Sequence, residues 1–297
     1  MRNRWNGDYA LLPPVHQYIV NRKIRLHYTS RGSFELLAHL ENLPYHNVRT
    51  LDLHIDKFFV DNESQRYFEK IVKTMEKCIH LDKLSLAMVP GVTPAVDSHM
   101  FEEQYHLPPL RDITLQSYSW PEEYEANHNY WNFSRIERLV LIDMPIRNFL
   151  VNSSFATSDL SHLTRLVLGD LVGGYLQSMQ ADNTNFMLMT DAAREVWKRA
   201  VNLQSLSIPK GWRSFLPSQD FGLLNPNLRE LNLLLRERRC DGALWTEPVN
   251  DTLDLEDLSA LHFACPRLRS LHFATRLSGQ WAVLPVCWSW KLCQVSS

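Results

Sequence analysis

The histidines of the chain, which are the side chains best suited to proton transfer or metal binding at neutral pH, show no catalytic spacing. Twelve occur, yet none stands in the H-E-x-x-H arrangement that puts two ligands and a base on one helix. His262 and His272 lie ten residues apart, the first in a helix-like segment and the second in a strand-like segment. We therefore expect no metal site.

Phosphate-binding and nucleophilic motifs are missing as well. Gly173 and Gly174 are not followed by the Lys and Ser or Thr of a phosphate-binding loop, and no G-x-S-x-G turn occurs. Five cysteines without C-x-x-C spacing favour reduced thiols of a cytoplasmic or nuclear protein over a disulfide framework: Cys78, Cys240, Cys265, Cys287 and Cys293. These features predict a protein that is not an enzyme and uses no cofactor. An active site hidden in longer insertions is the alternative.

One short phrase recurs eight times between residues 48 and 273. It consists of an aliphatic residue, two variable residues, Leu or Ile, one variable residue and a second apolar residue. The copies are VRTLDL (48–53), LDKLSL (81–86), LRDITL (110–115), IERLVL (136–141), LTRLVL (163–168), LQSLSI (203–208), LRELNL (228–233) and LRSLHF (268–273). Their fourth positions lie 25 to 40 residues apart, and units of that length are typical of a solenoid, in which stacked repeats share one core.

Each phrase reads as a strand with one buried face, because apolar and variable residues alternate. Apolar residues at helical spacing fill several gaps, at 34–41, 62–79, 190–200 and 254–264. Segment 62–79 would bury Met75 and Ile79. We expect an α/β solenoid over residues 24–276, with about eight or nine units. Its parallel sheet would line the concave side, with helices or irregular segments on the convex side, and residues 24–28 would form a first strand.

The repeats resemble the leucine-rich repeat family over residues 48–273, although the Asn or Cys that follows the strand in that family has no counterpart here. The irregular unit length is most similar to the divergent repeats that follow the F-box in fungal F-box proteins. That resemblance implies a substrate receptor of a cullin-type ubiquitin ligase. Residues 1–23 form a leading segment that is too short for an F-box, which puts binding of a Skp-type adaptor in question.

Side chains between the buried positions of each strand should form rows on the concave face. The candidate partner-binding residues on this face are Arg138, Val140, Ile142, Arg165, Val167, Asn232 and His272. The two valines and the isoleucine would make a small exposed apolar patch bordered by the two arginines, a composition that suits a protein contact. The alternative is that an insertion folds over this patch and buries it.

Three insertions, at 117–133, 169–190 and 236–252, interrupt the regular spacing. The first offers Trp120, Tyr124 and Trp131 as partner-binding anchors, because large aromatic side chains bury much area. The alternative is that some of them pack against the flank of the sheet. The second begins with glycines and is expected to be a flexible loop. The third opens with a short basic run that could meet an acidic peptide or a phosphate, although such runs are more often solvated turns.

Charge and hydropathy limit the classes of partner that the chain could bind. The net charge of −2 provides no basic surface for nucleic acid, and no segment approaches the roughly 20 apolar residues of a membrane helix. The first residues lack the apolar core of a signal peptide. Residues 277–297 alternate apolar and polar residues, which predicts either a cap on the end of the solenoid or an irregular tail.

The expected function is therefore protein–protein recognition by a monomer, with a protein partner of unknown identity. A stand-alone scaffold or inhibitor would use the same face. Two further hypotheses are an enzyme with its site in the insertions and a decayed relative that has kept no partner.

Overall fold

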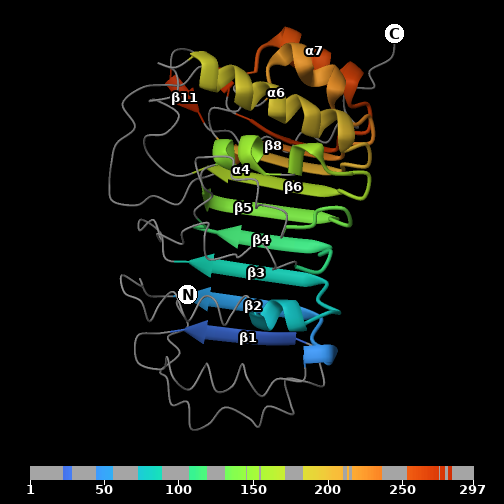
Figure 1. Ribbon diagram of the computed structural model, residues 1–297. Helices are drawn as coiled ribbons and strands as arrows, with labels where there is room; N and C mark the ends of the chain where they lie inside the picture. Colours follow the sequence, from blue (N-terminus) through green and yellow to red (C-terminus); the bar gives the residue numbers. More distant parts are fainter. Residues whose placement is uncertain are drawn as a thin grey trace.

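One parallel sheet runs through the part of the chain that the structure describes. The computed structural model describes residues 23–28, 45–55, 73–88, 107–118, 131–144, 146–153, 155–170, 183–209, 213, 216–235, 253–273, 275–277 and 280–282. Within these residues, nine strands pair in chain order from one end of the sheet to the other (Figure 1). They are β1 (Lys23–Tyr28), β2 (Thr50–Ile55), β3 (Lys83–Met88), β4 (Asp112–Gln116), β5 (Arg138–Met144), β6 (Arg165–Asp170), β7 (Ser205–Pro209), β8 (Glu230–Leu235) and β9 (Ser270–His272).

Equivalent positions of the repeated phrase face one another across the sheet. The fourth positions form one continuous row of paired residues: Leu51, Leu84, Ile113, Leu139, Leu166, Leu206, Leu231 and Leu271. Strand β1 extends this row, because Ile24 pairs with Leu51. The eight strands expected from the phrase and the additional first strand are confirmed. The protein is thus an α/β protein with an open, all-parallel sheet, which is compatible with a solenoid.

A ladder of backbone hydrogen bonds joins each unit to the next at the start of the strands. The carbonyl oxygen of Arg49 accepts from the N–H groups of Asp82 and Lys83 at 2.9 and 3.0 Å. The carbonyl of Arg229 accepts in the same way from Arg269 and Ser270, at 2.8 and 3.0 Å, and the five steps between repeat the pattern. Each unit is therefore held against the next at the spacing of neighbouring strands, about 4.8 Å.

The apolar core lies on one side of the sheet, where the helices pack. The helical elements are η2 (Tyr45–Asn47), α4 (Ile146–Asn152), η5 (Phe155–Thr157), α6 (Asn183–Arg199), η7 (Ser218–Leu223) and α7 (Leu255–Ala264). In Figure 1, α4 lies near β6, and α6 and α7 lie toward the C-terminal end of the sheet. Helix residues such as Phe149, Trp197 and Leu261 share one core with the leucines of the strands.

Aromatic rings fill the middle of this core. Phe133 is 1% exposed, and its ring centroid lies 5.9 Å from that of Phe149 and 5.3 Å from that of Phe155. Phe149 and Phe155 are themselves 5.1 Å apart. Edge-to-face and tilted contacts of this kind add to the stabilisation that burial alone provides.

The helices expected in the gaps are partly confirmed. Residues 255–264 form α7 as expected, and residues 190–199 belong to α6. Residues 73–77 are helical and bury Met75, but Ile79 follows in a turn and is 65% exposed, so its predicted burial was wrong. The flexible loop expected over 169–190 was also wrong at its end, because α6 begins at Asn183. The helix carries Met189, Ala193 and Val196 into the core at helical spacing.

The C-terminal region contains a second, smaller sheet. Strand β10 (Thr275–Leu277) pairs antiparallel with β11 (Gln280–Ala282). Strand β11 lies within residues 277–297, expected to be a cap or an irregular tail, whereas β10 begins at the end of the segment expected to be solenoid. The predicted helix at 34–41, the insertion at 236–252 and the residues after 282 lie outside the described residues.

Candidate functional site

The candidate site is the face of the sheet opposite the core, called here the second face. It is made by the third and fifth positions of the phrase and the residue after the phrase. Its central row contains polar residues at six of eight positions: Asp52, Ser85, Thr114, Val140, Val167, Ser207, Asn232 and His272. The six polar members are half-buried, and none of the eight belongs to the apolar core. This face therefore presents polar atoms in rows on a rigid support.

A charged row runs beside the central row. The sheet register places Lys83, Asp112 and Arg138 on three adjacent strands. The Asp112 carboxylate lies 3.9 Å from the ammonium nitrogen of Lys83 and 3.5 Å from the guanidinium of Arg138. Arg165 pairs in register with Arg138, and within the described residues no carboxylate lies at ion-pair distance from it. The middle of this row thus carries excess positive charge that a carboxylate could neutralise.

The apolar patch expected between the arginines is not exposed. Val140 and Val167 are register partners on β5 and β6, and each is only 6% exposed. Their register partners on the flanking strands β4 and β7 are Thr114 and Ser207, which are half-buried. Ile142 is half-buried. The prediction of an exposed apolar patch was therefore wrong, and the accessible groups here are the arginine heads.

The remaining candidates of this face lie farther along the sheet. Asn232 on β8 and His272 on β9 are register partners and are half-buried. Nε2 of His272 lies 3.1 Å from Oγ of Ser270. Strand β7 separates this pair from Arg165, so the structure places the predicted residues on one face but in two groups.

Of the three aromatic residues predicted as anchors in the first insertion, only Trp131 lies within the described residues. Trp131 is only 4% exposed, stacks on Phe133 with ring centroids 6.2 Å apart and meets Tyr118 edge-on at 6.2 Å. Trp131 is therefore a core residue and not an exposed anchor, as the alternative of packing against the flank of the sheet expects. Trp120 and Tyr124 lie outside the described residues.

Metal-ligating side chains do not cluster in the described part of the chain. Among these residues, no three His, Cys, Asp or Glu side chains lie close enough to hold a metal ion. The two described cysteines, Cys78 and Cys265, are buried, and burial raises their thiol pKa values to about 12 and about 11. No helix within the described ranges has the length and apolar character needed to cross a bilayer.

A second charged row was missed by sequence reasoning. It is formed by the second positions of the phrase, at the start of the strands: Arg49, Asp82, Arg111, Glu137, Thr164, Gln204, Arg229 and Arg269. Opposite charges pair in its first half, with Arg49 to Asp82 at 3.3 Å and Arg111 to Glu137 at 3.5 Å. Two neutral residues follow, and the row ends in two arginines. Aligning the second letters of the eight phrases would have shown this pattern.

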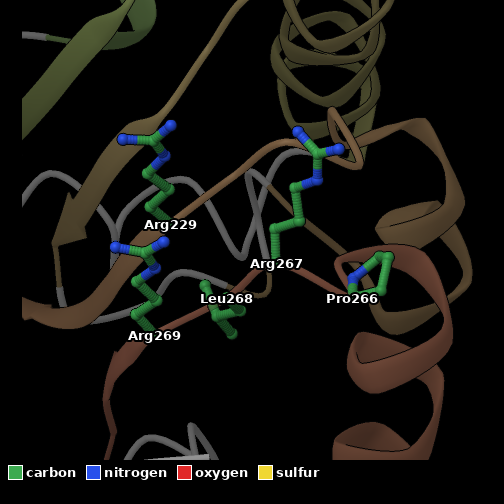
Figure 2. Close-up of a pocket in the computed structure, with 5 residues that line it drawn as sticks. All are labelled: Arg229, Pro266, Arg267, Leu268 and Arg269. Carbon is green, nitrogen blue, oxygen red and sulfur yellow. The ribbon is translucent and has the colours of Figure 1, made fainter.

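Those last two arginines border a hollow on the surface. It has a volume of about 310 Å³ and is lined by Arg229, Pro266, Arg267, Leu268 and Arg269. Figure 2 shows Arg229 and Arg269 side by side, with Arg267 across from them.

In comparisons with known proteins, no family model matches the chain and no curated protein matches it.

Proposed function

We propose that this protein is a protein-recognition module that binds its partner through the second face of the sheet. The observation that carries the proposal is the central row from β2 to β9, in register and opposite the core, in which six of the eight side chains are polar and half-buried. Because the sheet holds these side chains before a partner arrives, little conformational entropy would be lost on binding.

The charges on this face favour an acidic segment of the partner. Arg138 and Arg165 are neighbours on β5 and β6, and Asp112 neutralises only part of their charge. A guanidinium can hold a carboxylate through two parallel hydrogen bonds, so an Asp or Glu of the partner would fit between the two heads. The contact would be polar, because the two valines of the central row are buried.

Within this proposal, the repeats are leucine-rich repeats and the chain is a relative of the substrate receptors of cullin-type ubiquitin ligases. The support is the eightfold phrase and the parallel strand order. A stand-alone scaffold or inhibitor in the cytoplasm or nucleus is the alternative, and it would use the same face. Capture by a purified Skp-type adaptor separates the two, because only the ligase role requires that contact.

Site-specific photocrosslinking tests the face itself. A photoreactive amino acid replaces Thr114 or Asn232 on the second face, and Glu256, an exposed residue of α7, in the control. We expect covalent adducts with one and the same partner from Thr114 and Asn232, and none from Glu256. Adducts formed mainly from Glu256 would show that binding uses the helical side and would refute the proposal.

Charge reversal gives an independent test on the captured partner. Arg165→Glu should abolish capture, because it places a negative charge where an acidic partner segment would sit. Arg135→Glu changes an exposed arginine outside the face and should leave capture intact. Equal capture by the two variants would refute the role assigned to Arg165.

A further inference from the structure

The arginine-lined hollow at the start of β8 and β9 differs from the rest of the strand-start row in its charge. The first four members of this row alternate in sign and form ion pairs at 3.3 and 3.5 Å. Arg229 and Arg269 occupy equivalent positions in adjacent units, but both are cationic. Opposite charges therefore neutralise one another in the first half of the row, but two like charges are neighbours at this end.

Backbone hydrogen bonds hold the two arginines at adjacent positions. The N–H groups of Arg269 and Ser270 both donate to the carbonyl oxygen of Arg229, at 2.8 and 3.0 Å. The backbones thus stay at the strand spacing, and Figure 2 shows the two side chains extending alongside each other. Repulsion between the heads acts against this arrangement, and a bound anion would remove it.

A third arginine completes the hollow from a separate element. Arg267 lies in the turn after α7, where the N–H of Leu268 donates to the carbonyl oxygen of Cys265 at 3.0 Å. The neighbouring Leu268 is buried, which anchors the turn that carries Arg267. Within the described residues, no carboxylate lies at ion-pair distance from any of the three guanidiniums, and the nearby Glu230 accepts a hydrogen bond from Ser205 at 2.9 Å.

We propose that Arg229, Arg267 and Arg269 form a binding site for a phosphate group. Three positive charges around one hollow match a dianion with several acceptor oxygens better than a carboxylate, which has one charge and two oxygens. The hollow of about 310 Å³ has room for the phosphate and for some of the atoms that carry it. The site lies at the start of the strands, so it is separate from the second face and does not depend on the function proposed above.

Calorimetric titration with three probes tests the site and identifies the source of the phosphate. The probes are inorganic phosphate, a phosphoserine peptide and the same peptide with unmodified serine. Saturable binding of either phosphate-bearing probe, with no binding of the unmodified peptide, supports the site. Tighter binding of the phosphopeptide than of inorganic phosphate assigns the site to a phosphorylated chain, and equal affinities assign it to the free anion.

Substitutions then show whether the three arginines are responsible. Arg229→Gln combined with Arg269→Gln should weaken phosphate binding by about tenfold or more, because each charge-assisted hydrogen bond contributes strongly to affinity. Arg267→Gln alone should weaken it as well, and this single change serves if the double variant folds poorly. Arg135→Gln, which removes an exposed arginine elsewhere, should bind like the unmodified protein. Equal phosphate affinity in all four proteins, or no saturable binding by the unmodified protein, would overturn the proposal.

Discussion

The guanidinium of Arg213 donates a hydrogen bond to the carboxylate of Asp257 across 2.6 Å, which connects the segment before η7 to the start of α7. Asp257 is only 5% exposed and also accepts from the N–H of Asp254, while the Asp254 side chain accepts from the N–H of Asp257 at 2.8 Å. The same arginine donates to Oγ of Ser218 at 2.7 Å. One buried carboxylate therefore completes the capping box of α7 and holds the neighbouring segment in place.

Asp257→Asn should lower the free energy of unfolding by about 2 kcal/mol. Removing one partner of a buried ion pair costs more than this, but Arg213 is about one third exposed and water screens part of the loss. Asp191→Asn is the control, because that carboxylate pairs with Arg194 at the surface and should contribute less than about 0.5 kcal/mol. Urea denaturation at neutral pH measures both, and equal stabilities of the two variants would contradict the assigned role.

The same carboxylate makes stability depend on acidity. Burial tends to raise the pKa of Asp257, but hydrogen bonds from Ser218, from the N–H of Asp254 and from Arg213 outweigh it and hold the pKa below its usual value. Its contribution is then fully present above the pKa of the unfolded chain, about 3.9, and disappears as the pH falls through the lower folded pKa. Between pH 5 and pH 2 the unmodified protein should lose more stability than Asp257→Asn. Parallel losses in urea unfolding across that range would show that the group titrates alike in both states.

Phe133→Ala should destabilise the protein by about 3 to 5 kcal/mol, because it removes a ring that touches two other buried phenylalanines and leaves a cavity. Phe263→Ala deletes the same side chain from α7, where it is 81% exposed, and should change stability by less than about 0.5 kcal/mol. Thermal and urea unfolding of the two variants measure both changes in the free energy of unfolding. A small effect at Phe133 would mean that the centre of the core lies elsewhere.

Much of the sheet could be predicted from sequence because its signal is local. Alternation of apolar and variable residues within six positions identifies each strand and its buried face, and Leu139 and Leu141 lie in the core as that pattern requires. Alternation does not predict how far the other face is exposed. Val140 and Val167 were assigned to the correct face, but each is only 6% exposed, which the alternation alone does not predict.

The parts that could not be predicted depend on contacts between units. Trp131 has the same side chain whether it binds a partner or packs on Phe133, and only the fold brings the two rings together. The pair Arg229 and Arg269 is separated by 40 positions in the chain, and the parallel register makes them neighbours. Charge rows of this kind become visible only when the repeats are aligned position by position.

The buried cysteines should resist alkylation in the folded protein. Cys78 is 0% exposed and Cys265 is 1% exposed, and burial raises their thiol pKa values to about 12 and about 11. At pH 8 very little thiolate is present, and the thiolate is the reactive form. Iodoacetamide followed by peptide mass mapping should label both only after urea is added. Rapid labelling of either residue without denaturant would show that its part of the core opens readily.

A matched pair of adjacent positions on β7 tests the orientation of the whole sheet. Leu206 is 0% exposed and pairs with Leu166 and Leu231 in the core row, so Leu206→Ala should cost about 2 to 5 kcal/mol. Ser207 is the next residue and faces the other side, so Ser207→Ala should change stability by less than about 0.5 kcal/mol. Since a shift of one residue would exchange the two faces, the ratio of the two effects reports the register directly. A larger loss from Ser207→Ala than from Leu206→Ala, measured by urea unfolding, would place the core on the opposite face and remove the structural basis for a polar binding surface.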